Sequence, residues 1–303
     1  MYSLPDVASI VASALAEDLG VTADAFTPGR VDRGLLARDV TSDSVLPPNA
    51  AFQGAIVARE ALTVAGLQVA ETVWTTLART AGMPGTVEVF PLVAEGAHVT
   101  GGTPLAEVSG PARIVLAGER TALNFVMVLS GIATETARWV AAAGPTVAVC
   151  DTRKTTPGLR VLSKYAVLVG GGTNHRQGLW DMVLVKDNHI AVAGGIEQAA
   201  QAARQKHPDL LVEIEADTIE AARQAALAGA DIVLLDNMSD AELAESVKAV
   251  RAIAAAGGRA ILTEASGGVE FARLSAIAAA GVDRVSTSAL TFAAPVDVAL
   301  DER

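Results

Sequence analysis

The chain of 303 residues contains a single cysteine, Cys150. It therefore cannot form an internal disulfide or a metal site built from several cysteines. No uninterrupted apolar run approaches the roughly 18 residues that cross a bilayer. The first residues carry neither the basic start nor the apolar stretch of a secretory signal. We therefore expect a cytoplasmic protein that folds on its apolar core alone.

Positive charge is also scarce, since 23 Lys and Arg against 34 Asp and Glu give a net charge of −11. Such an acidic chain is a poor candidate for general nucleic-acid binding. Residues 151–186, called the basic segment below, are the exception, with six basic and two acidic residues. We expect one of the six, Lys164, on a helix surface. The basic segment suggests a cleft for a small anion, although a solvated basic face would give the same count.

The first 120 or so residues mix helix and strand patterns. Periodicity predicts helices at 6–19 and 66–80, and strands at 52–58, 86–90 and 105–108. Turn formers dominate residues 22–50, which we interpret as a long loop with a surface insertion at 23–38. The short strands and tight turns are typical of an antiparallel sheet.

The later part of the chain alternates apolar strand patterns with Ala-rich helices. The predicted strands are 146–150, 182–186, 211–215, 231–235, 260–264 and 282–286. The predicted helices are 195–206, 218–228, 240–256 and 269–280. This alternation indicates right-handed βα units and a parallel sheet, so the fold class is α/β.

Nearly every predicted strand ends in residues that can do chemistry. In strand order these are Asp151 with Arg153 and Lys154, Lys186, Glu213 with Glu215, Asp236, Glu264 with Ser266, and Ser286. In a parallel barrel all strand ends point to one rim, whereas a doubly wound sheet concentrates such residues at one switch point. The sequence therefore favours an irregular α/β barrel with fewer than eight strands.

Three groups on this rim are open to more than one interpretation. Ser266-Gly267-Gly268, before a predicted helix, suits a phosphate oxyanion but is also an ordinary helix start. Glu215 and Asp236 could hold Mg²⁺, bind sugar hydroxyls or stabilise a cation, or they could be solvated strand ends. Lys186 could form a Schiff base if it were buried, which would indicate an aldolase-like enzyme.

A series of ordered motifs resembles the quinolinate phosphoribosyltransferase family. The motifs lie at 119–125, 130–134, 151–160, 170–179, 186–190, 213–215, 235–237 and 264–268, and the last four contain Lys-Asp-Asn-His, Glu-Ile-Glu, Leu-Asp-Asn and Glu-Ala-Ser-Gly-Gly. The chain departs from the family near its end, where Ser288 and Phe292 stand in place of a usual Gly and His. Alternatives are a related family linked to molybdenum transport, a non-catalytic phospho-sugar binding protein and the Schiff-base aldolase.

The resemblance implies two domains. The first, at 1–122 with the C-terminal segment 290–303, would be an N-terminal α/β sandwich, and the second, at 123–289, an open, irregular α/β barrel. Active sites would be shared in a homodimer or a larger assembly such as a hexamer. In the implied reaction, quinolinate and phosphoribosyl pyrophosphate give nicotinate mononucleotide, pyrophosphate and CO₂ with Mg²⁺, a step of NAD biosynthesis.

The resemblance also implies roles for particular residues. Quinolinate would be bound by Arg120, Arg153, Lys154, His175, Arg176 and Lys186, with Arg120 supplied by the partner subunit. Catalysis would fall to Lys154, Glu215 and Asp236, and the latter two would also face the ribose and the metal. The phosphate groups would be bound by Ser266, Gly267, Gly268, Ser286 and Ser288.

Overall fold

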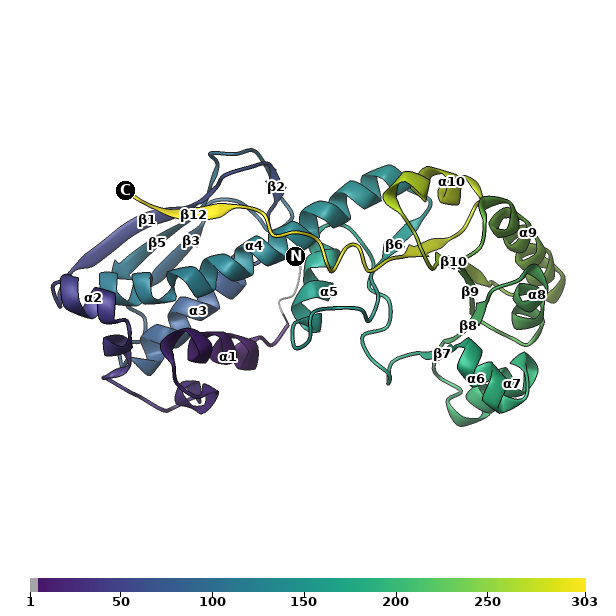
Figure 1. Ribbon diagram of the computed structural model, residues 1–303, viewed down its shortest axis with the longest axis horizontal. Coiled ribbons are helices and arrows are strands. Elements are labelled where there is room, and N and C mark those ends of the chain that lie inside the picture. The colour runs from purple at the N-terminus through teal and green to yellow at the C-terminus, as the bar shows by residue number, and fades with distance from the viewer. Residues whose placement is uncertain (1–4) are drawn as a thin grey trace. The chain divides into compact units, whose positions relative to one another are not determined.

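The computed structural model describes residues 5–303, and these form two compact units, each of α/β type (Figure 1). The first unit comprises the described residues up to 135 together with 156–171 and 292–303. The second unit comprises 136–155 and 172–291. Residues 1–4, which contributed to the expectation of no secretory signal, lie outside the described part.

The first unit is built on an antiparallel sheet, as the turn-rich pattern predicted. Its order is β12 (Val298–Glu302), β1 (Ala51–Ala58), β5 (Pro104–Pro111) and β3 (Glu88–Pro91). A separate pair is formed by β2 (Leu62–Thr63) and β4 (His98–Val99). The C-terminal segment thus returns to this unit and pairs with β1 in register Ala55↔Asp301.

Three helices of the first unit, α1 (Ala8–Leu19), α3 (Leu67–Thr80) and α5 (Arg160–Val169), bury apolar residues. The short helix α2 (Val40–Val45) leaves both of its valines exposed. Residues 22–50 are not one long loop, because they contain α2 and the 3-10 helices Ala23–Phe26 and Leu35–Arg38. The surface prediction for Lys164 is wrong, since α5 buries this side chain to 1% exposure.

Helix α4 (Ala112–Ala143) has 32 residues, beginning in the first unit and ending in the second. By length and composition alone it could cross a membrane, which a search for uninterrupted apolar runs does not detect. However, 67% of its most apolar window is buried inside the protein, as in the core helix of a globular domain.

The second unit contains a six-stranded, wholly parallel sheet. Its order is β6 (Ala148–Cys150), β11 (Arg284–Ser286), β10 (Leu262–Ser266), β9 (Ile232–Asp236), β8 (Val212–Ala216) and β7 (Val183–Val185). Because β6 and β7 are the two ends of this order, the sheet does not close. This confirms the open barrel of fewer than eight strands.

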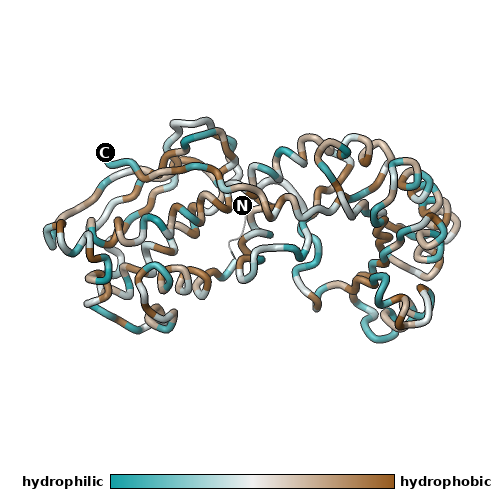
Figure 2. The backbone as a smooth tube through the Cα atoms, in the orientation of Figure 1, coloured by the Kyte–Doolittle hydropathy of each residue, from teal (hydrophilic) through white to brown (hydrophobic). Residues whose placement is uncertain are grey.

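Helices connect the strands of the second unit. They are α6 (Asp187–Ala193), α7 (Ile196–Lys206), α8 (Ile219–Leu227), α9 (Asp240–Gly257) and α10 (Leu274–Ala279), the last preceded by a 3-10 turn at Phe271–Arg273. Helix α9 starts at a capping box, in which the Ser239 hydroxyl accepts from the Glu242 N–H and the Glu242 side chain accepts from the Ser239 N–H. Apolar residues gather along the strands, while hydrophilic residues are frequent over the outer helices (Figure 2). Because all six strands are parallel, their carboxyl ends lie at one edge of the sheet.

Candidate active site

The carboxyl ends of these strands surround a pocket of about 360 Å³ within the second unit. Ten residues predicted from the sequence line it: Arg153, Lys154, His175, Arg176, Lys186, Glu215, Asp236, Ser266, Gly267 and Ser286. Thr152, Leu184 and Leu234 complete the lining and were not predicted. Residues far apart in the sequence thus meet because parallel strands share one rim.

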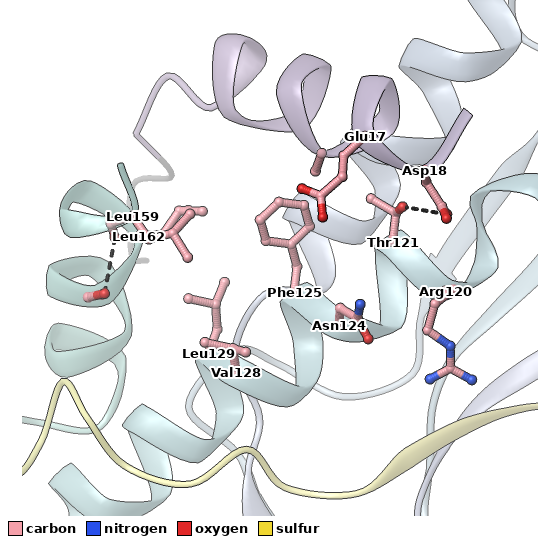
Figure 3. Close-up of a pocket in the computed structure, with 12 residues that line it drawn as sticks. Glu17, Asp18, Arg120, Thr121, Asn124, Phe125, Val128, Leu129, Leu159 and Leu162 are labelled. Carbon is pink, nitrogen blue, oxygen red and sulfur yellow. Dashed lines mark hydrogen bonds between the residues drawn. The ribbon is translucent and has the colours of Figure 1, made fainter. Parts of the chain in front are cut away.

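Three predicted residues lie elsewhere. Gly268 and Ser288 are in the second unit but are not part of the pocket lining. Arg120 lies on α4 in the first unit, where it lines a separate pocket of about 350 Å³ (Figure 3). One part of that pocket is polar and includes Glu17 and Asp18, and another is apolar, formed by α4 and α5 side chains.

One wall of the second-unit pocket is cationic. Burial lowers the pKa of Arg176, and the nearby positive charge of Arg153 lowers it further. The charges of Glu213 and Asp181 offset part of this effect. An anion bound in the pocket would be attracted by both arginines. Lys154 lies on the loop after β6, where the Thr291 hydroxyl donates to the Lys154 carbonyl oxygen at 2.7 Å and holds the loop in place.

Two carboxylates lie at the carboxyl ends of the neighbouring strands β8 and β9. Glu215 accepts from Lys186 Nζ at 2.6 Å, and Asp236 accepts from Asn237 Nδ2 at 2.7 Å. Burial raises the pKa of Asp236, and the negative charge of Glu215 raises it further. Carboxylate oxygens are the ligands that Mg²⁺ prefers, and a cation would relieve their repulsion, so the donor set fits this metal.

The Ser-Gly-Gly turn after β10 passes very close to Asp236. Gly267 has φ +76°, and a Cβ there would lie 2.5 Å from Asp236 Oδ1 and 2.6 Å from Asn237 Oδ1. Only glycine fits this combination of backbone angle and contact. At the neighbouring strand end, Ser286 Oγ donates to Ser266 Oγ at 3.1 Å. Two hydroxyls and a tight turn therefore meet beside the carboxylates. The helix predicted directly after this turn is replaced by a 3-10 turn at Phe271–Arg273 and by α10.

A buried cluster behind the pocket wall was missed by the sequence analysis. His175 Nε2 lies 3.0 Å from Glu213 Oε2 and 3.3 Å from Glu264 Oε1, and both glutamates are fully buried. Arg284 Nε lies 3.3 Å from Glu264 Oε2. The alternation of Glu213 and Glu215 along one strand was the available signal, but it did not separate their roles. In the structure Glu215 lines the pocket and Glu213 lies beneath it.

The pKa values of the residues in this cluster are set by burial and by the charges of their neighbours. Burial lowers the pKa of His175, but hydrogen bonds and charges from Glu213 and Glu264 outweigh it and raise the value to about 9. Burial and the charge of Glu264 raise the pKa of Glu213. For Glu264, burial is outweighed by His175 and Arg284, which lower its pKa. Burial and neighbouring charges therefore shift the pKa values of Glu213 and Glu264 in opposite directions.

Neither Lys186 nor Cys150 has the surroundings of a catalytic nucleophile. The Lys186 side chain is 47% exposed and paired with Glu215, unlike the buried lysine of a Schiff-base enzyme. Burial, with a contribution from the charge of Glu264, raises the pKa of the Cys150 thiol to about 12. The thiol accepts from Arg284 Nε and Nη2 at 3.4 Å and is a structural group.

Comparison with known proteins covers both units of the chain. Models of the quinolinate phosphoribosyl transferase N-terminal and C-terminal domains match residues 39–130 and 132–301. A carboxylating nicotinate-nucleotide pyrophosphorylase from Mycobacterium leprae is 39% identical over 267 residues, which are 87% of this chain and 90% of that protein. The human protein of the same name is 44% identical over 205 residues, which are 66% and 68%. The solved nicotinate-nucleotide pyrophosphorylase of Francisella tularensis has a TM-score of 0.85 at 32% identity, covering 100% of this chain and 98% of that one.

Proposed function

This chain belongs to the quinolinate phosphoribosyltransferase family, and we propose that its second-unit pocket carries out the family's reaction. The reaction joins quinolinate to the ribose of phosphoribosyl pyrophosphate, releases pyrophosphate and CO₂, and leaves nicotinate mononucleotide. The division of the pocket into a cationic wall and a carboxylate pair carries the proposal. Quinolinate is a dianion and its partner substrate a polyanion, so a basic pocket on an acidic protein suits both.

The cationic wall would bind quinolinate. Arg153, Arg176 and Lys154 line one pocket. The positive charge of Arg153 lowers the pKa of Arg176, which indicates that the two side chains lie near each other. A guanidinium grips a carboxylate with two parallel hydrogen bonds, so the two arginines can fix both substrate carboxylates and orient the ring nitrogen. Lys186 joins this group when it leaves Glu215.

The carboxylates would stabilise charge that develops on the ribose. As the ring nitrogen bonds to the anomeric carbon and pyrophosphate leaves, that carbon acquires oxocarbenium character, which Glu215 and Asp236 oppose with negative charge. They would also hold Mg²⁺, which when bound would supply positive charge to the leaving pyrophosphate. Ser266, Gly267 and Ser286 would receive the 5′-phosphate, with Gly268 and Ser288 supporting the loops.

Decarboxylation needs no further cofactor in this proposal. Alkylation of the ring nitrogen creates a pyridinium, which accepts the electron pair left when the adjacent carbon–carbon bond breaks and CO₂ departs. The ring carbon then takes up a proton. Lys154 and the arginines would hold the departing carboxylate in position until this step.

We also propose a cytoplasmic homodimer with shared active sites. Every other residue assigned to quinolinate belongs to the second unit, whereas Arg120 belongs to the first and lines a pocket of its own. A two-fold dimer would let Arg120 of one subunit reach the site of the other, because such interfaces are reciprocal.

The direct test is an assay with quinolinate, phosphoribosyl pyrophosphate and Mg²⁺. We expect nicotinate mononucleotide, pyrophosphate and CO₂ in equal amounts, and loss of all three in EDTA or in Asp236→Asn. Asp283→Asn, which changes a carboxylate at the opposite end of the same sheet, is the matched control and should stay active. Pyrophosphate released without CO₂ would indicate a different phosphoribosyl acceptor.

A further inference from the structure

Asn237, the residue directly after β9, has a backbone conformation that disfavours every residue except glycine. Its φ is +55°, and no other non-glycine residue in the described part of the chain has a positive φ. In this left-handed region the Cβ of an L-residue approaches the backbone, whereas glycine has no Cβ. Such residues gather at functional sites, where the surrounding structure holds them. The presence of asparagine here, beside the pocket but not among its lining residues, therefore requires an explanation.

The amide side chain of Asn237 is committed to a neighbouring carboxylate. Nδ2 donates to Asp236 Oδ2 at 2.7 Å. This orientation of the amide is fixed by chemistry, because a carboxylate accepts hydrogen bonds and only the nitrogen end of the amide can donate one. The final torsion of an aspartate side chain is broad when nothing restrains it. The hydrogen bond from Asn237 therefore restricts the rotation of the Asp236 carboxylate.

Asn237 also contacts the Ser-Gly-Gly turn after β10. Its backbone N–H donates to the Ser266 carbonyl oxygen at 3.1 Å. Its Oδ1 atom lies over the turn, since a Cβ on Gly267 would be 2.6 Å from it and a Cβ on Gly268 would be 3.6 Å from it. One residue thus connects the carboxylate at the end of β9 to the turn at the end of β10.

We propose that Asn237 is a positioning residue, which holds the Asp236 carboxylate in a fixed orientation beside the Ser-Gly-Gly turn. This inference rests on the proposed function, because it takes Asp236 as a group that stabilises charge on the ribose. Such stabilisation is effective when the charged group is already in place before the reaction begins. The hydrogen bond from Asn237 supplies that orientation, and glycine at the same position could not.

Two other roles for Asn237 lead to different expectations. An ordinary turn residue could be replaced by glycine without loss of activity, because glycine adopts φ +55° more readily. A Mg²⁺ ligand acting through Oδ1 could be replaced by aspartate, which keeps an oxygen ligand. A positioning residue tolerates neither change, because both remove the N–H donor that Asp236 accepts from.

The first test is Asn237→Gly, measured by urea unfolding, kinetics and calorimetry. The urea midpoint should equal or exceed that of the unaltered protein, because the strained backbone is relieved. The value of kcat/KM for phosphoribosyl pyrophosphate should nevertheless fall about 10- to 100-fold, the usual cost of losing such a support. Quinolinate affinity should stay within about twofold, the scatter expected for independent sites. A merely structural residue would not raise stability while lowering activity.

The second test is Asn237→Asp. Aspartate tolerates the left-handed conformation and has nearly the same size, but it places a second negative charge against Asp236. We expect the loss of kcat/KM to be at least as large as in Asn237→Gly. A variant that keeps its activity would assign Asn237 to Mg²⁺ and overturn the proposal.

Asn49→Gly is the matched control, because it removes the same amide from an exposed turn of the first unit. The φ of Asn49 is not positive, so this variant should lower the urea midpoint slightly and leave kcat/KM unchanged.

Three results for Asn237→Gly would overturn the positioning role. They are native kcat/KM in the folded protein, a loss of quinolinate affinity as large as the loss of kcat/KM, and a lowered urea midpoint that accompanies the loss of activity. Failure of the unaltered enzyme to release pyrophosphate and CO₂ from the two substrates would instead reject the proposed function.

Discussion

Replacing Gly267 with alanine would have two effects, a strained backbone conformation and a close contact between the new Cβ and Asp236. The left-handed backbone at φ +76° costs an L-residue about 1–2 kcal/mol. The new Cβ would also lie 2.5 Å from Asp236 Oδ1. Since ordinary contacts begin near 3.4 Å, the Asp236 carboxylate must move by about 1 Å, and a misplacement of that size in an active site costs about 100-fold in rate.

Gly229→Ala provides the comparison. Gly229 has φ +97°, but a Cβ there meets nothing within 4 Å. Urea unfolding should therefore show that both variants lose about 1–2 kcal/mol of stability, while only Gly267→Ala loses kcat/KM for phosphoribosyl pyrophosphate, by about 100-fold. Similar kcat/KM losses in the two variants, or an active Gly267→Ala protein, would refute the placement of Asp236 in the reaction.

Four further predictions follow from the same structure. Lys154→Ala should lose kcat/KM far more than Lys248→Ala, which removes the same charge from the exposed face of α9; equal losses would remove Lys154 from the site. Nicotinate should be turned over at least about 100-fold more slowly than quinolinate, because it leaves part of the cationic wall without a carboxylate partner; comparable rates would exclude a pocket for a dianion. Cys150, whose pKa burial raises to about 12, should resist iodoacetamide at pH 8 until urea unfolds the protein; rapid labelling of the native form would contradict its burial. Mixed dimers of Arg120→Ala and Lys154→Ala subunits should recover about half of the native sites, and no recovery after proven exchange would place Arg120 in its own subunit's site.

The sequence was sufficient for the parallel sheet and its rim because both depend on local patterns. Short apolar runs bounded by glycine-ended helices give strands, and alternation with helices makes them parallel. The side chains that follow each strand must then share one edge, whatever the details of packing. This is why Arg153, Glu215 and Ser286 could be brought to one pocket from spacing alone.

Long-range packing was not available from those patterns. Lys164 looks like a surface residue by charge, yet α5 places it in the core of the first unit. Helix α4 has an apolar window that the search for uninterrupted runs did not detect, because polar residues interrupt it, and 67% of that window is buried in the protein. Burial depends on the elements packed around a side chain and not only on the side chain's own chemistry.

Glu213 and Glu215 show the same limit within a single strand. Alternation requires both side chains to lie on one face of β8, and both do. Depth along that face is set by the neighbours: Glu213 pairs in register with Ile232 on β9, deep in the sheet, while Glu215 pairs with Leu234 nearer the rim. A rise of about 7 Å along one strand thus separates a fully buried glutamate from one that lines the pocket.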